Sequence, residues 1–287
     1  MIVVAGGTGR LGQRVVRRLL ERGLAVRVLT RSPTGVTGLP AAVDLAVGDV
    51  RDRASLRAAM VGARTVVSAV QGVTGKGGDS PATVDRDGNA NLADLAAEAG
   101  ADMVMLSVVG ASPDSPLELF AMKYAAEQHL RASGVPATVV RATAFAELWV
   151  EIVRKTAGRS GRPVVFGRGD NPVNFVCVDD VAAAVEYAVV EPSTRGSLMQ
   201  IGGPDTVTLS ELAALVQAVD GGTGEPRHVP RLALKGLAGS VGRVRPAFGR
   251  QLRMALAMDS MDLTFDAVAM PATSPPLPGT PLSGCLG

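Results

Sequence analysis

The sequence predicts an α/β protein with a doubly wound parallel sheet and a smaller C-terminal substrate-binding cap. Short apolar, β-branched runs recur through residues 1–141, and stretches with apolar residues at helical spacing separate them. Because strands that alternate with helices form a parallel sheet covered on both faces, this rhythm predicts the sheet. From Phe145 onward the alternation loosens, which predicts a partly helical cap, a common place for substrate selection.

The first expected element is a strand over residues 2–5, followed by a glycine turn and a helix. Gly6, Gly9 and Gly12 stand at a spacing of three before an amphipathic segment that Gly23 ends. Glycines let a backbone approach phosphates closely, and the N–H groups at a helix start attract negative charge. The arrangement indicates a Rossmann-type fold that binds a dinucleotide pyrophosphate. The alternative is a turn that needs glycine only for its backbone shape.

The remaining elements of the sheet follow in alternation. The expected strands after the first cover residues 25–30, 43–47, 65–70, 103–107 and 137–141. The expected helices after the first cover residues 53–60, 89–99 and 117–132. Asp52 is the expected N-cap of the helix over residues 53–60. In the cap, Thr208 and Glu211 stand at the spacing of a capping box.

These elements predict a single domain over residues 1–270. The Rossmann core is expected mainly in residues 1–144, and the cap mainly in residues 145–175 and 195–270. The glycine-rich stretch over residues 71–85 predicts an irregular loop that acts as a flap over the site. Residues 271–287 are rich in proline, glycine, serine and threonine without a helical or strand period, which predicts a disordered tail.

Composition and charge exclude several classes of function. The 29 basic and 27 acidic residues give a net charge of +2 without a basic block, and only 3% of the chain is aromatic, so no nucleic-acid partner is expected. The first strand starts at Met1, and no apolar run approaches the ~20 residues that span a bilayer. We therefore expect a cytoplasmic protein without a signal peptide and with no membrane partner. The sequence does not indicate the oligomeric state.

The cysteines and histidines predict neither a disulfide framework nor a metal site. Cys177 stands in an apolar run and Cys285 in the expected tail, which is unlike a disulfide-rich scaffold. His129 and His228 are far apart in the sequence, and the four residues lack metal-ligand spacing. We therefore expect no metal.

Several motifs occur together in the order typical of a known family. They are "GGTGRLG" after the first strand, "TRS" after the second, "GDVRD" after the third, "VDRDGNANLADLAAEAG" before the fifth, and then "KYAAEQHLRASGVPATVVRATAF", "FVCVDDVA" and "IGGPDTVTLSEL". With these motifs over residues 1–212, the chain resembles the atypical short-chain dehydrogenase/reductase superfamily, in particular its NmrA-like, NAD(P)H-binding branch.

The resemblance implies cofactor-binding roles for residues at the ends of the strands. Those expected to wrap the pyrophosphate are Gly6, Thr8, Gly9, Arg10, Leu11 and Gly12. The others are Asp49 and Val50 at the adenine, Ala69 and Val70 along the adenosine ribose, Lys123 at the nicotinamide ribose, and Thr143 with Phe145 beside the nicotinamide and the substrate.

Arg31 decides the expected choice of cofactor. A fold that selects NAD places an acidic residue at the end of the second strand to bond the ribose 2′-hydroxyl, whereas this strand ends in Thr30, Arg31 and Ser32. A guanidinium pairs with a 2′-phosphate and stacks on adenine. Arg31, with Arg10, therefore favours NADP(H). The alternative is a solvated arginine at a strand end.

The catalytic residues are predicted by the same resemblance, with one departure from the pattern. Short-chain dehydrogenases usually move a proton with a tyrosine four residues before a lysine, but Leu119 stands four residues before Lys123. Tyr124 is adjacent to the lysine and points about 100° away around the helix. Two roles remain open for Lys123: proton transfer, as in isoflavone-reductase-like relatives, or a bond to the nicotinamide ribose. Ser107 is expected either to polarise a substrate carbonyl or to bond the local backbone.

Two classes of function follow. The first is an NADPH-dependent oxidoreductase that transfers hydride to a small organic carbonyl or quinone. The second is a non-catalytic NADP(H)-binding redox sensor that acts through a protein partner, and the missing tyrosine favours it. An epimerase or dehydratase shares the fold, but it normally depends on the tyrosine and lysine pair, so Leu119 counts against that reading.

Overall fold

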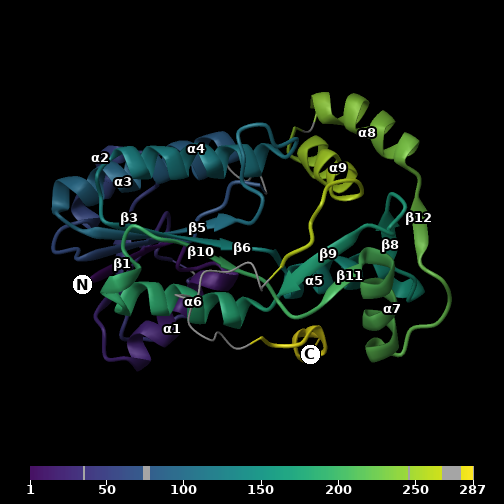
Figure 1. Cartoon of the computed structure of the whole chain (residues 1–287), viewed down its shortest axis with the longest axis horizontal. Helices are drawn as coiled ribbons and strands as arrows, with labels where there is room; N and C mark the ends of the chain where they lie inside the picture. The colour runs from purple at the N-terminus through teal and green to yellow at the C-terminus, as the bar shows by residue number, and fades with distance from the viewer. Residues whose placement is uncertain (35, 74–77, 245, 267–278, 287) are drawn as a thin grey trace. The chain divides into compact units, whose positions relative to one another are not determined.

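In the computed structural model the chain divides into two units (Figure 1). The structure describes every residue except 35, 74–77, 245, 267–278 and 287. The first unit contains residues 1–142 and 178–201, and the second contains residues 143–177 and 202–287. Residues 195–201, which the sequence analysis assigns to the cap, belong to the first unit because a strand within them joins its sheet.

The first unit is built on a parallel sheet of seven strands. In chain order they are β1 (Ile2–Ala5), β2 (Val26–Thr30), β3 (Asp44–Val47), β4 (Thr65–Ser68), β5 (Asp102–Val108), β6 (Ala137–Ala142) and β10 (Leu198–Ile201). Their order in the sheet is β10-β6-β5-β4-β1-β2-β3, and all six pairings are parallel. The predicted fold class is therefore confirmed. The strand order reverses between β1 and β4, and ligands of such sheets bind outside the carboxyl ends of the strands at this reversal.

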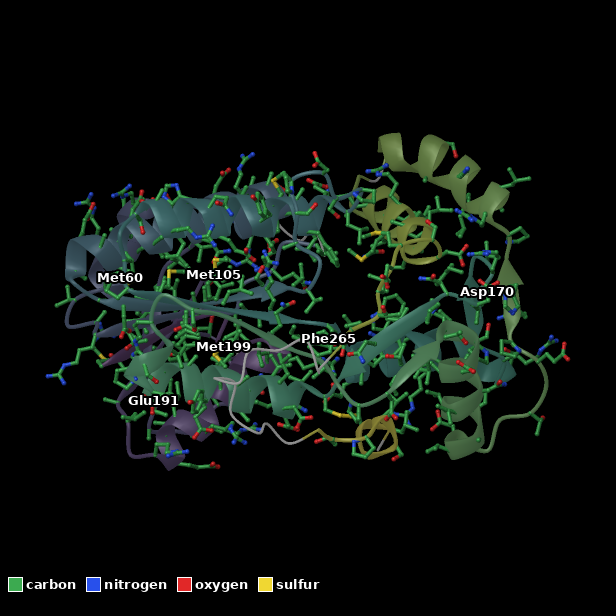
Figure 2. The ribbon with its side chains drawn as sticks, viewed as in Figure 1. Met60, Met105, Asp170, Glu191, Met199 and Phe265 are labelled. Carbon is green, nitrogen blue, oxygen red and sulfur yellow. A yellow bond between two sulfur atoms is a disulfide. The ribbon has the colours of Figure 1, made fainter. Side chains whose placement is uncertain are left out.

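Helices cover both faces of this sheet. On one face α1 (Arg10–Glu21) packs against α6 (Val178–Val190), and on the other lie α2 (Arg53–Ala59), α3 (Asp87–Ala99) and α4 (Glu118–Ala132) (Figure 1). Figure 2 shows Met60 and Met105 between the sheet and α3 and α4, within one buried apolar cluster. Leu92 and Leu130 are buried in the same cluster, and burial of such a side chain contributes about 1.5–3 kcal/mol.

Local sequence signals explain where several elements begin. The Asp52 side chain accepts a hydrogen bond from Ala54 N at 3.0 Å, which confirms the predicted cap of α2. The prediction of an irregular loop over residues 71–85 is wrong for its last part, because Pro81–Arg86 form a π-helical segment (η2) that runs into α3. Ser80 and Thr83 form a capping box at its start, a local signal that the high glycine content of this stretch hides.

The second unit has two small sheets and four α-helices among its described residues. One sheet has the order β11 (Thr206–Thr208), β9 (Pro172–Val176), β7 (Ala144–Phe145), and the other pairs β8 (Val164–Phe166) with β12 (Arg227–Val229). The helices are α5 (Ala146–Ala157), α7 (Leu209–Asp220), α8 (Arg231–Val244) and α9 (Pro246–Met258). Thr208 and Glu211 form the predicted capping box at the start of α7, with bonds of 2.8 and 3.1 Å.

The end of the chain differs from the expected disordered tail. Residues 271–278 and 287 lie outside the described residues, but Leu282–Cys285 form a 3-10 helix (η6) whose Leu282 and Cys285 are buried. Cys285 forms a disulfide with Cys177, 108 residues earlier, a pairing that the sequence analysis did not expect. The sequence separation hides this pairing, since only the folding of the second unit brings η6 to the end of β9.

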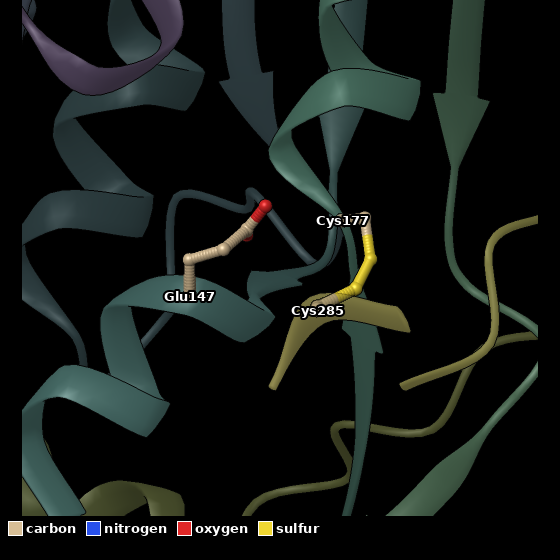
Figure 3. Close-up of side chains that lie close together, drawn as sticks. All are labelled: Glu147, Cys177 and Cys285. Atoms are coloured by element: carbon tan, nitrogen blue, oxygen red, sulfur yellow. A yellow bond between two sulfur atoms is a disulfide. The ribbon is translucent and has the colours of Figure 1, made fainter. Parts of the chain in front are cut away.

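Figure 3 shows this disulfide beside Glu147, on α5. The two sulfur atoms and a Glu147 carboxylate oxygen lie within 4.8 Å of one another. Thiolates are the form in which cysteine binds metals, and a disulfide offers none.

Within the described parts of the chain, no helix combines the length and the apolarity that crossing a bilayer requires.

Candidate functional site

The glycine turn after β1 packs closely against the end of β4, at the reversal of strand order. Gly6 has a φ of +81°, and a Cβ on it would lie 2.5 Å from the carbonyl oxygen of Ala69. A Cβ on Gly12 would lie 2.1 Å from the carbonyl oxygen of Gly6. Only glycine satisfies both contacts, so the turn and the first turn of α1 are wound tightly at the carboxyl ends of β1 and β4.

The start of α1 has the properties of an anion site. Gly9 is the N-cap and offers no side chain to the first N–H groups of the helix, and the first helical turn contains no acidic residue. Thr8, Gly9 and Arg10 are exposed, whereas Leu11 is buried beneath them. A helix start with uncapped N–H groups attracts phosphate. These residues therefore fit a dinucleotide pyrophosphate.

Four charged side chains contact one another in a row: Arg31 after β2, Asp79, and Arg51 with Asp49 after β3. Arg51 bonds both oxygens of Asp49 through Nε and Nη2, at 2.6–3.1 Å. Arg51 Nη1 also lies 3.1 Å from Oδ1 of Asp79, and Arg31 Nη1 donates to both oxygens of Asp79 at 3.0 Å. The hydrogen bonds from Arg51 hold the pKa of the Asp49 carboxyl below its usual value, and the charge of Arg31 adds to this effect. Sequence reasoning missed Arg51 and Asp79, since Asp79 stands in a glycine-rich stretch without a motif.

Val50 follows β3, and Ala69 and Val70 follow β4, at the carboxyl ends of these strands. Val50 is buried, and a Cβ on Gly88 would lie 2.7 Å from its Cγ2, so α3 passes close beneath it. Ala69 N donates to Ala5 O at 2.9 Å, which continues the pairing of β1 with β4 beyond the strands. The carbonyl oxygen of Val70 accepts a hydrogen bond from Lys123 Nζ at 3.1 Å.

Lys123 is buried against a buried carboxylate. Its Nζ lies 3.1 Å from Oδ1 of Asp85, and Oδ2 of Asp85 accepts from Gly72 N at 2.9 Å. Burial raises the pKa of the Asp85 carboxyl, and the charge of Lys123 opposes that rise. Asn89 bonds Asp85 O at 2.7 Å and accepts from Ser68 Oγ at 2.6 Å, which ties this segment to the end of β4. The motif "VDRDGNANL" contains Asp85 and Asn89, but sequence reasoning assigned neither a role.

Ser107 contacts a buried carboxylate of α4. Its hydroxyl donates to Glu127, a fully buried residue of α4. Glu127 also accepts from Arg141 Nε at 2.9 Å and Nη2 at 2.6 Å. Because a hydroxyl has a single proton and Glu127 receives it, Ser107 cannot donate the same proton to a carbonyl. This bond competes with the catalytic role expected for Ser107, which stays a prediction.

Thr143 and Phe145 belong to the second unit. Thr143 Oγ1 donates to Asn174 Oδ1 at 2.9 Å, and Phe145 lies on β7, opposite Val176 of β9. The other predicted cofactor residues belong to the first unit. Some of them lie in the glycine turn or in the first turn of α1, and others follow β2, β3 or β4. Lys123 belongs to α4, and its side chain reaches the end of β4.

The parallel sheet and the glycine turn define a doubly wound α/β protein of the Rossmann type. The chain belongs to the NmrA-like family, whose model matches residues 1–270. This membership confirms the NmrA-like part of the resemblance found in the sequence.

The chain is similar to several characterised reductases. It is 34% identical over 226 residues to a (4-alkanoyl-5-oxo-2,5-dihydrofuran-3-yl)methyl phosphate reductase of Streptomyces griseus, which covers 77% of this chain and 74% of that one. It is 30% identical over 227 residues to an NAD(P)H azoreductase of Xenophilus azovorans, with the same two coverages. Its fold matches that of an NADPH-dependent quinone oxidoreductase of Escherichia coli complexed with NADPH, with a TM-score of 0.79 at 21% identity over 100% of this chain and 98% of the other.

Proposed function

We propose that this protein is an NADPH-dependent oxidoreductase that transfers hydride to a small organic carbonyl or quinone in the cytoplasm. One observation carries the proposal: two consecutive residues after β4 join the phosphate-binding turn to the buried lysine. Ala69 O lies against Gly6, and Val70 O accepts from Lys123. A single strand end thus connects the two groups that a nicotinamide dinucleotide would span.

The similarity to an NAD(P)H azoreductase and to a (4-alkanoyl-5-oxo-2,5-dihydrofuran-3-yl)methyl phosphate reductase supports the proposal of an oxidoreductase. When bound, a nicotinamide cofactor supplies the hydride, which no amino-acid side chain can provide. The remaining tasks belong to residues of this chain: the glycine turn binds the pyrophosphate, and Arg31 binds a 2′-phosphate.

Lys123 has N–H donors left for a ligand. An ammonium has three donors; one of those of Lys123 bonds Val70 O, and the nitrogen lies 3.1 Å from Oδ1 of Asp85. We propose that a further N–H donates to the ribose on the nicotinamide side, or to the oxygen that receives the hydride. In both positions the Asp85 contact holds the ammonium at the end of β4.

Calorimetric titration with NADPH and NADH, followed by NADPH oxidation against quinones, azo dyes and aldehydes, tests the proposal. Binding of NADPH with turnover of an acceptor is the expected result. Binding of NADPH without turnover of any acceptor would contradict it and favour the redox sensor, for which a protein partner would then be sought. A protein that binds neither cofactor would contradict both readings.

A further inference from the structure

Asp79 lies between two guanidinium groups at the adenosine side of the proposed cofactor site. Both of its oxygens accept from Arg31 Nη1 at 3.0 Å, and Oδ1 lies 3.1 Å from Arg51 Nη1. The Asp79 side chain is 8% exposed, whereas that of Arg31 is 53% exposed. A nearly buried carboxylate therefore contacts one terminal nitrogen of the arginine that is expected to bind the 2′-phosphate.

Two guanidinium groups face two carboxylates in this cluster. Arg51 is already paired with both oxygens of Asp49, so the positive charges of Arg31 and Arg51 face two carboxylates. Among the described residues, the Nε and Nη2 atoms of Arg31 have no hydrogen-bond acceptor. Arg31 thus keeps a two-donor edge that suits a phosphate, but its charge is offset by Asp79.

We infer that Asp79 is an internal counter-ion that sets the choice between NADP(H) and NAD(H). Its negative charge repels a 2′-phosphate bound to the neighbouring edge of Arg31, and partial burial limits the screening of this repulsion. The native protein then favours NADP(H) less than Arg31 alone would make it, and loss of the carboxylate increases the selectivity for the 2′-phosphate. The inference rests on the proposed function, because it needs Arg31 to face the adenosine ribose.

A different role for Asp79 predicts the opposite result. If the carboxylate served mainly to position Arg31, its removal would release the guanidinium and weaken phosphate binding. The direction of the change in affinity therefore separates a counter-ion from a positioning residue. A gain in affinity also cannot arise from a damaged fold.

Calorimetric titration of the full chain with 2′,5′-ADP and 5′-ADP tests the inference without turnover. We expect Asp79→Asn to raise the ratio of the two affinities about tenfold in favour of 2′,5′-ADP. Asp79→Ser tests the same change if the amide prevents folding. Asp44→Asn is the matched control, because Asp44 pairs with Arg27 at 2.6 Å on β3, and its ratio should equal that of the native protein.

The gain should disappear in the double variant Arg31→Leu, Asp79→Asn. Suppose that Arg31→Leu weakens 2′,5′-ADP binding, but both Asp79 variants leave the affinity ratio unchanged or lower it. That result would overturn the role of Asp79 and leave the phosphate role of Arg31 standing. If Arg31→Leu leaves 2′,5′-ADP binding unchanged, the proposed phosphate role of Arg31 fails, and the inference fails with it.

Discussion

The ammonium nitrogen of Lys123 lies 3.1 Å from Oδ1 of Asp85, and the two side chains are 4% and 0% exposed. This pair connects α4 to the segment that precedes α3, at the end of β4. A buried charge without a partner is strongly unfavourable, so each member depends on the other. The first two predictions follow from this relationship.

Asp85→Asn should destabilise the protein by about 3–5 kcal/mol, because it leaves the Lys123 ammonium buried without a counter-charge. Urea unfolding measures the change in the free energy of unfolding. The double variant Asp85→Asn, Lys123→Met should recover most of the loss, since it removes both charges. Equal loss in the single and double variants would show that the pair is not coupled.

Lys123→Met should lower turnover about 100-fold or more while NADPH still binds, since positioned proton donors contribute roughly that much. Steady-state kinetics and calorimetry separate the two roles proposed for this lysine. A fall in kcat with a small change in the dissociation constant of NADPH indicates proton transfer. A rise mainly in that constant indicates a bond to the ribose, and unchanged values of both would exclude Lys123 from the site.

Ser107→Ala should leave turnover within a few-fold of the native value, because the Ser107 hydroxyl donates to Glu127 rather than to a substrate. We expect a loss of stability of about 1–3 kcal/mol, since the buried carboxylate loses one donor. Chemical denaturation and steady-state rates measure the two effects. A large fall in kcat with full stability would support the catalytic role predicted for Ser107.

Gly12→Ala should abolish NADPH binding and lower stability by about 1–3 kcal/mol, because the new Cβ would overlap the carbonyl oxygen of Gly6. Gly236→Ala is the matched control: it lies within α8, and a Cβ there meets no atom within 4 Å. The control should raise stability by about 0.4–1 kcal/mol and leave binding unchanged. Equal behaviour of the two variants would argue against a tightly wound turn.

The pKa of Asp49 predicts a loss of stability in acid. Its pKa in the folded protein lies below the ordinary value of 3.8, chiefly through the hydrogen bonds from Arg51. A lowered carboxyl pKa contributes stability that is complete above the unfolded value and is lost as the pH falls through the folded value. The difference in unfolding free energy between the native protein and Asp49→Asn should therefore be constant above about pH 5 and shrink below about pH 4. A difference that is independent of pH would contradict the ion pair.

Local patterns predicted much of the fold. The strand, glycine turn and helix at the start of the chain depend on neighbouring residues, and so do the caps formed by Asp52 and by Thr208 with Glu211. Such signals act within a few residues of one another, so they can be found in one sequence. The glycine-rich stretch was harder to interpret, because its capping box at Ser80 lies next to residues typical of loops.

The sequence alone determined the fold class, the glycine turn and the basic end of the second strand, because each depends on the periodicity or backbone freedom of adjacent residues. Only the tertiary structure decided which charges meet. Asp79 reaches Arg31 across 48 residues, Asp85 reaches Lys123, and Cys177 reaches Cys285 across 108. Such pairs follow from how strands and helices are packed, and a carboxylate or thiol in the sequence has no local feature that names its distant partner.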